Sequence, residues 1–160
     1  MELIDFAEQQ GKTNFEWQTK VNETIRQETN ITLGFLMTGG GAALAWAVQH
    51  AAIHEPNVPL IAAVLVLGIW LFGLAMALVF RCLNFVESMP PANQPSNIYQ
   101  PKFDTLGMRE IQLQYLEEAI LYAIEKGQPR AKSLRRVRLF ICLSPAVFLL
   151  AWWLSHECLR

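Results

Sequence analysis

Residues 58–80 read VPLIAAVLVLGIWLFGLAMALVF and contain no charged side chain. About 20 consecutive apolar residues are enough for an α-helix to cross the hydrocarbon core of a bilayer, and this stretch has 23 residues. Inside a bilayer the backbone amides must find hydrogen-bond partners within the segment, which a helix provides. The stretch therefore predicts a membrane-spanning helix in an integral membrane protein.

Two further apolar stretches lie at residues 31–53, which begin ITLGFLMTGGGAALAWAV, and at residues 137–155, VRLFICLSPAVFLLAWWLS. Hydrophobic residues make up 52% of the chain, and they gather in these three stretches. In the last stretch Arg138 is near the entry end, where a long side chain can reach the headgroups, and Pro145 is expected to kink the helix. We predict three transmembrane helices, with residues 31–83 forming a hairpin.

The remaining segments are polar and mostly helical. Thr13 and Glu16 have capping-box spacing, and the absence of proline and glycine between Gly11 and Gly34 predicts one helix running into the first span. Residues 87–103 contain four prolines and read as an extended linker.

We expect Asp104 to cap a helix that ends at Gly127, and Pro129 to open the helix that enters the membrane. The predicted fold class is all-α, with three transmembrane helices and a cytoplasmic helical layer.

Lysine and arginine placement predicts the orientation of the spans. The turn at residues 54–57 has none, whereas residues 81–138 have nine. Basic residues mark cytoplasmic loops. We therefore expect residues 1–30 and 84–136 in the cytoplasm, with residues 156–160 on the opposite side of the membrane.

Small residues are frequent in the first two predicted spans, where they let helix backbones approach closely. Such contacts can join the two spans of one subunit or join subunits around an axis, and three consecutive glycines can also form a flexible gate. The candidate residues for oligomer packing or gating are Gly34, Gly39, Gly40, Gly41, Ala45, Gly73 and Ala77.

A basic cluster precedes the third span. Juxtamembrane basic residues orient a helix and attract anionic lipid, and a nucleotide or RNA signal is the alternative ligand. The members of this cluster are Arg130, Lys132, Arg135, Arg136 and Arg138.

All three histidines fall on the predicted outer side. Imidazole, carboxylate and thiolate groups are metal ligands, although solvated interfacial side chains explain the same positions. The candidate metal ligands are His50, His54, Glu55, His156 and Cys158.

The sequence gives no sign of catalysis. It contains no GxSxG nucleophile motif, no phosphate-binding loop and no HExxH zinc-protease motif. The net charge is −1, and the chain has no basic face with interleaved aromatic residues of the kind that binds nucleic acid. We expect no enzyme activity, no cofactor and no nucleic-acid partner. Two apolar stripes on the cytoplasmic helices are candidate surfaces for a protein partner; they contain Phe15, Val21 and Ile25, and Leu113, Leu116, Ile120 and Ile124.

Residues 115–134 carry a family resemblance. Tyr115-Leu-x-x-Ala119-Ile120, Lys126-Gly127, Ala131 and Leu134 precede an apolar helix. This pattern resembles small prokaryotic membrane effectors of antiphage defence, of the SLATT-like kind. The resemblance implies an oligomeric effector that perturbs or permeabilises the inner membrane when a sensor releases it, and it carries over no catalytic residue. The alternative hypothesis is an accessory or scaffolding subunit of a larger membrane complex.

Overall fold

The computed structural model describes residues 3–52, 57–83 and 105–158. Helix accounts for 98% of these residues, and this described part contains no strand. The all-α prediction is therefore confirmed for the described chain. The proline-containing linker, Asp104, His54 and Glu55 lie outside the described residues.

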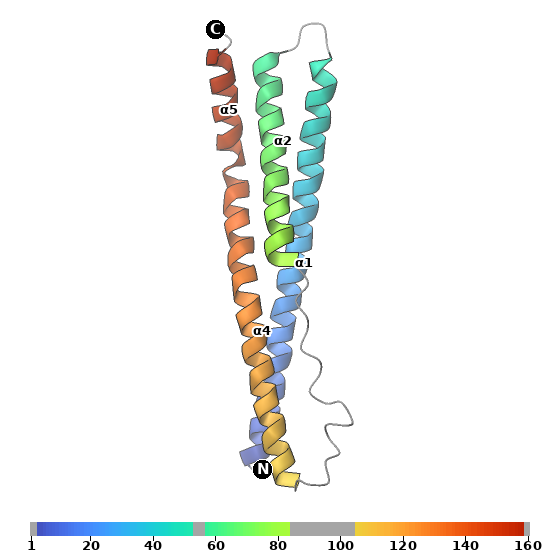
Figure 1. Ribbon diagram of the computed structural model, residues 1–160, viewed down its shortest axis with the longest axis vertical. Coiled ribbons are helices and arrows are strands. Elements are labelled where there is room, and N and C mark those ends of the chain that lie inside the picture. The colour runs from blue at the N-terminus through green and yellow to red at the C-terminus, as the bar shows by residue number, and fades with distance from the viewer. Residues whose placement is uncertain (1–2, 53–56, 84–104, 159–160) are drawn as a thin grey trace. The chain divides into compact units, whose positions relative to one another are not determined.

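The helices follow one another in the order shown in Figure 1. Their bounds are α1 Leu3–Ala51, α2 Val58–Leu78, the π-helix η1 Val79–Leu83, α4 Thr105–Cys142 and α5 Ser144–Cys158. Helix α2 begins with a cap, in which the Asn57 side chain accepts a hydrogen bond from the Leu60 amide at 3.4 Å. Proline in the first turn suits this start because the amide it lacks would have no helical partner.

Helix α1 is continuous for 49 residues, so the prediction that the N-terminal helix runs into the first apolar stretch is confirmed. The predicted start at Thr13 is wrong, because the helix begins at Leu3 and the Thr13 hydroxyl donates to the Gln9 carbonyl inside it. Gly11 marks a helix contact instead of a helix start. A Cβ atom there would lie 2.6 Å from Leu116 Cδ2.

Helix α4 is also continuous, so the predicted end at Gly127 and new start at Pro129 are wrong. Gly127 is buried, and a Cβ atom on it would meet the Asn22 side chain. This glycine serves helix packing and not helix termination. Pro129 deprives the helix of one amide donor, which the continuing helix tolerates.

The third apolar stretch contains a break beside Pro145. Helix α4 ends at Cys142, α5 begins at Ser144, and the two are bent by 43°. Proline cannot donate to the carbonyl four residues earlier and its ring clashes with that carbonyl. The Leu143 amide is shared between the Leu139 and Phe140 carbonyls, at 3.2 Å each, and the predicted kink is confirmed.

Two described helices, α1 and the continuous segment Val58–Leu83, are long and apolar enough to cross a membrane. The bent pair formed by α4 and α5 makes a third candidate if it counts as one span. The structure thus agrees with two or three membrane-spanning helices by length and composition.

The chain divides into two compact units. The first contains Met1–Ile25 and Phe85–Pro129, and the second contains Arg26–Asn84 and Arg130–Arg160. Helices α1 and α4 contribute residues to both.

In the first unit, the N-terminal half of α1 pairs with α4. Contacts join Glu8 to Arg109 and Gly11 to Leu116, and Asn22 Nδ2 donates to the Ala123 carbonyl at 3.2 Å. Later residues of one helix meet later residues of the other, so the two helices run parallel. A polar side chain such as asparagine in the seam of a helix pair fixes its register.

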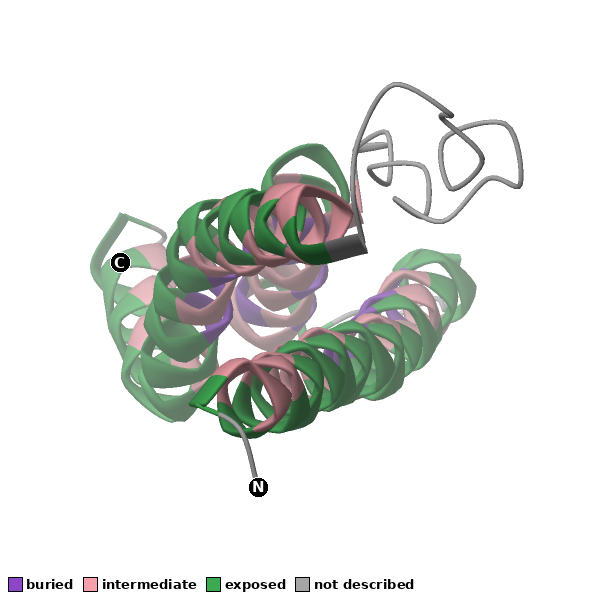
Figure 2. Cartoon of the chain, turned by 90° about the horizontal axis from the view of Figure 1, so that it is seen from below, coloured by how far each residue is buried: buried purple, intermediate pink, exposed green. Residues whose placement is uncertain are grey.

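In the second unit, α2 contacts both α1 and α5, and Figure 1 shows these three helices side by side. Buried residues are confined to narrow stripes, and most of the helix surface is exposed (Figure 2). The buried stripe of α1 contains Thr29, Thr32, Leu36, Gly40 and Ala47. A bundle this thin exposes apolar side chains that lipid or other chains can cover.

Candidate functional site

Neighbouring glycines of α1 lie on different sides of the helix. Gly40 is buried against α2, whereas nothing lies within 4 Å of a Cβ atom built on Gly41 or Gly34. Successive residues of an α-helix are rotated by about 100°, so three consecutive glycines cannot all meet one partner. The predicted packing residues therefore divide into an inner and an outer group.

The inner group forms the closest contact between α1 and α2. A Cβ atom on Gly40 would lie 3.0 Å from Phe72 Cδ2, and one on Gly68 would lie 2.7 Å from Leu44 Cδ2. Each glycine receives the large side chain that lies one turn beyond the opposite glycine. Gly68 also approaches the backbone, since its Cβ would lie 3.4 Å from the Gly40 carbonyl oxygen.

The predicted packing residues do not include Gly68, because the positions four residues before and after it on α2 are the larger Val64 and Phe72. The signal that identifies it is a glycine followed four residues later by a large apolar residue, on both helices. A Cβ atom on Gly39 would make an ordinary contact with Leu71 Cδ1, at 3.6 Å.

The outer group lies opposite the buried stripe of α1. Its members recur every three or four residues, so they share one side of the helix. All are exposed or partly exposed, and all are small or uncharged polar residues: Gly34, Thr38, Gly41, Ala45 and Gln49. We call this set the outer face of α1.

On α2, the predicted pair Gly73 and Ala77 does not share the inner contact. Gly73 is exposed with nothing within 4 Å of its Cβ position, and Ala77 is partly exposed. Unfilled small residues therefore occur on both helices of the hairpin.

The break in the third apolar stretch packs against α2. The rings of Trp70 and Phe140 meet edge to face, with centroids 6.0 Å apart. Among the described residues, the Trp70 Nε1 and Ser144 Oγ atoms are buried without a hydrogen-bond partner. Unpaired buried polar atoms cost free energy, so this contact is a weak point of the bundle.

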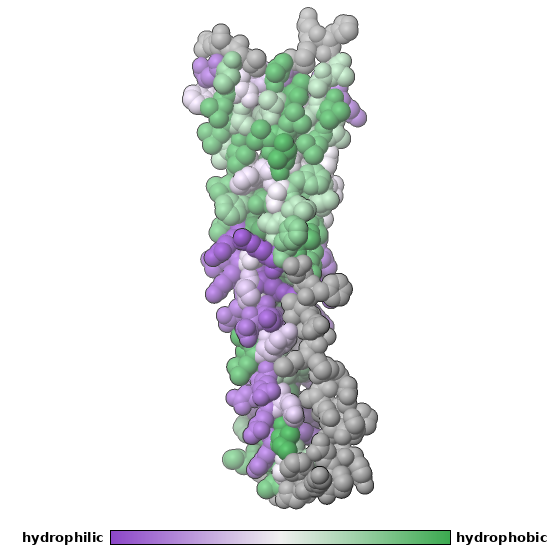
Figure 3. All heavy atoms as spheres, viewed as in Figure 1, coloured by the Kyte–Doolittle hydropathy of each residue, from purple (hydrophilic) through white to green (hydrophobic). Residues whose placement is uncertain are grey.

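The basic cluster lies where the apolar bundle ends. Figure 3 shows hydrophobic side chains covering the apolar helices and a hydrophilic band next to them. Arg138 pairs with Glu28 at 3.0 Å, so its side chain is directed to a carboxylate within the second unit. Helix α1 and the π-helix η1 each add one exposed basic residue, Arg26 and Arg81 respectively.

Cys82 joins three helices beside this cluster. Its side chain is buried, and its Sγ donates to the Arg130 carbonyl at 3.6 Å. It also interacts with the buried hydroxyl of Thr29. The segments of α1, η1 and α4 that carry the basic residues are therefore tied together.

Each of the histidines that the structure describes lies beside a tryptophan of its own helix. The His50 and Trp46 ring centroids lie 4.0 Å apart, and those of His156 and Trp152 lie 5.9 Å apart. The described residues contain no group of three metal-ligating side chains, and Cys158 is an exposed thiol. The candidate metal ligands thus gain no support from the part of the chain that is described.

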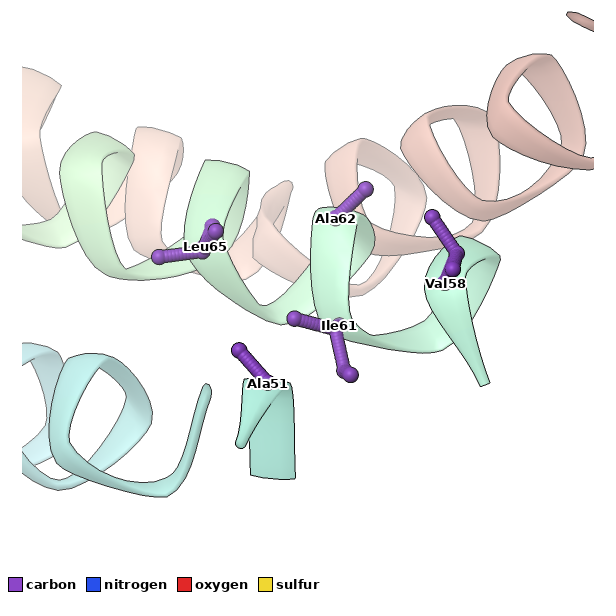
Figure 4. Close-up of a pocket in the computed structure, with 5 residues that line it drawn as sticks. All are labelled: Ala51, Val58, Ile61, Ala62 and Leu65. Atoms are coloured by element: carbon purple, nitrogen blue, oxygen red, sulfur yellow. The ribbon is translucent and has the colours of Figure 1, made fainter. Parts of the chain in front are cut away.

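A shallow hollow of about 250 Å³ lies at the end of the hairpin (Figure 4). Figure 4 shows Ala51 of α1 beside Ile61 of α2. The lining side chains are all aliphatic: Ala51, Val58, Ile61, Ala62 and Leu65. With no polar group to orient a ligand, the hollow is suited to a hydrocarbon chain.

One ion-pair cluster ties the helix pair of the first unit. Arg109 Nε donates to Glu8 Oε1 at 2.6 Å, and its Nη2 donates to Asp5. The hydrogen bond from Arg109 lowers the pKa of the Glu8 carboxyl below its ordinary value of 4.5, and the same carboxylates raise the pKa of Arg109. The cluster contributes to pairing while Glu8 is ionised.

We expect acid to loosen this helix pair. Because the Glu8 pKa is lower in the folded pair, its contribution is complete above pH 4.5 and is lost as the pH falls through the lowered pKa. Thermal unfolding followed by circular dichroism should show the melting temperature falling below pH 4.5. Glu8→Gln should show a smaller fall, and identical pH profiles for the two proteins would contradict a role for this carboxylate.

Comparisons with protein-family models, curated proteins and solved structures found no match for this chain.

Proposed function

We propose that this chain is a membrane effector that assembles with copies of itself and permeabilises or perturbs the bacterial inner membrane. The observation that carries the proposal is the outer face of α1. Lipid-facing helix surfaces are usually lined by large apolar side chains, whereas small residues on a membrane helix favour contact with another helix. Gly40 and Gly68 already form the contact between α1 and α2 within one chain, so the exposed small residues of the outer face are available to pack against a second chain.

The same face supports a pore in such an assembly. Thr38 and Gln49 are exposed, uncharged and polar, and glycine and alanine lie between them. If copies of α1 surround an axis, backbone carbonyls and these polar groups can line a water-filled path. A role in antiphage defence is supported by the resemblance of residues 115–134.

The orientation in this proposal follows from the basic residues at one end of the second unit. We propose that this end faces the cytoplasm, together with the N-terminus, and that the C-terminal end of α5 faces outward. In this proposal the outer face of α1 lines a water-filled path between the two sides of the membrane only when several copies of the chain are assembled.

A second candidate is an accessory subunit that binds an unlike protein. Apolar side chains exposed in the first unit favour it, such as Trp17 at 61% and Tyr115 at 55% exposure. The predicted stripe at residues 113–124 offers less free surface than expected, because its members are only partly exposed and Leu116 packs over Gly11.

The experiment that separates the two candidates uses the full chain alone. It is purified in a mild uncharged detergent, its mass is determined, and ion flux is measured after reconstitution into liposomes. A defined homo-oligomer that conducts is the expected result. A monomer that is silent in liposomes, and that forms a stable complex only with an unlike chain, would overturn the effector proposal in favour of the accessory subunit.

A further inference from the structure

One face of α4 changes from basic to apolar along its length. Lys132, Arg135 and Arg136 are exposed at i, i+3 and i+4 spacing. The next positions at the same spacing are exposed and apolar: Leu139 at 59% and Phe140 at 44% in α4, and Leu143 at 51% in the turn that directly follows α4. Residues three and four apart are neighbours on a helix, so these six side chains form one continuous stripe. We call it the amphiphilic stripe.

The amphiphilic stripe points away from the interior of the bundle. Leu134 and Val137 lie on the other side of the same helix, and they are 4% and 6% exposed. Phe140 reaches Trp70 at the edge of the stripe, with 6.0 Å between ring centroids. The stripe is therefore held in place by buried neighbours while its own surface stays open.

The positive charges of the stripe are not neutralised within the described part of the second unit. No described carboxylate forms an ion pair with Lys132, Arg135 or Arg136. Glu28, the described acid at this end, already pairs with Arg138. Exposed Arg26 and Arg81 add further positive charge, so the electrostatic potential here favours an anion.

We propose that the amphiphilic stripe binds an anionic phospholipid. Its phosphate would lie among Lys132, Arg135 and Arg136, and an acyl chain would lie along Leu139, Phe140 and Leu143. Charge complementarity selects an anion, and the apolar half of the stripe selects one that carries hydrocarbon. This site does not depend on pore formation, so it can fail or hold independently of the proposed function.

The test uses the full chain in an uncharged detergent, titrated with fluorescent phosphatidylglycerol and, separately, with fluorescent phosphatidylcholine. The wild-type protein is expected to prefer the anionic lipid. Each basic residue near a membrane surface contributes a factor of about five, so Lys132→Gln/Arg135→Gln/Arg136→Gln should weaken phosphatidylglycerol binding on the order of a hundredfold. Binding of phosphatidylcholine should change little.

Three controls make the test specific. Lys12→Gln/Lys20→Gln/Lys126→Gln removes the same charge from the first unit and should leave binding unchanged. Lys132→Arg/Arg135→Lys/Arg136→Lys keeps the charge and should retain the preference. Leu139→Gln/Leu143→Gln should weaken the binding of both lipids, because it removes the surface for the acyl chain.

Several results would overturn the lipid site. One is equal phosphatidylglycerol binding by the wild type and the triple glutamine variant. Another is an equal loss in the control that alters the first unit, which would show a response to net charge alone. Displacement of the lipid by soluble glycerophosphoglycerol at similar concentration would identify a phosphate site without a lipid component.

Discussion

Gly41→Leu is expected to reduce ion flux through liposomes to the level of protein-free vesicles and to convert the homo-oligomer to smaller species. Gly41 belongs to the outer face of α1, where nothing lies within 4 Å of the added Cβ atom. A leucine there leaves the fold of one chain undisturbed but separates two chains that pack through small residues. The measurements are the mass of the detergent-purified protein and the flux after reconstitution.

The control for added bulk is Ala146→Leu, an exposed position on α5 outside the outer face. It should keep the wild-type mass and flux. The thermal stability of Gly41→Leu should stay close to that of the wild type, because nothing lies within 4 Å of the added Cβ atom. A Gly41→Leu protein that stays oligomeric and conducts fully would remove the outer face of α1 from the subunit interface.

Gly68→Leu is expected to destabilise the individual chain. Its Cβ atom would lie 2.7 Å from Leu44 Cδ2 and 2.8 Å from Leu44 Cγ, and 3.4 Å from the Gly40 carbonyl. Overpacking a filled contact costs about 1–3 kcal/mol, and here a whole leucine must enter between two helix backbones. We therefore expect a loss of about 3 kcal/mol in the free energy of unfolding, measured by denaturant titration in detergent.

Gly73→Leu is the matched control on the same helix. It introduces the same side chain five residues later, where nothing lies within 4 Å of the Cβ position. The stability of this variant should stay close to that of the wild type. Equal losses for Gly68→Leu and Gly73→Leu would mean that leucine is disfavoured at both positions for a reason unrelated to the contact with α1.

Local signals in the sequence succeeded where the cause is local. The charge-free run at residues 58–80 predicted a long apolar helix, since hydrophobic length alone qualifies a helix to span a bilayer. Pro145 predicted the break between α4 and α5, because the missing amide acts on the residues of its own turn. The same reasoning failed at Gly11 and Gly127. A helix start was predicted at Thr13, just after Gly11, and a helix end at Gly127, but each of these glycines lies against a side chain from another helix.

The sequence by itself determined the helical class of the chain, its two or three apolar segments and the position of the basic cluster, because each is a property of consecutive residues. Only the tertiary structure decided which glycines of α1 face α2 and which face outward. It also decided that Glu28 forms its ion pair with Arg138, while Lys132, Arg135 and Arg136 stay exposed. The physical reason is that packing and ion pairing join residues far apart in the chain, and helical periodicity gives their sides but not their partners.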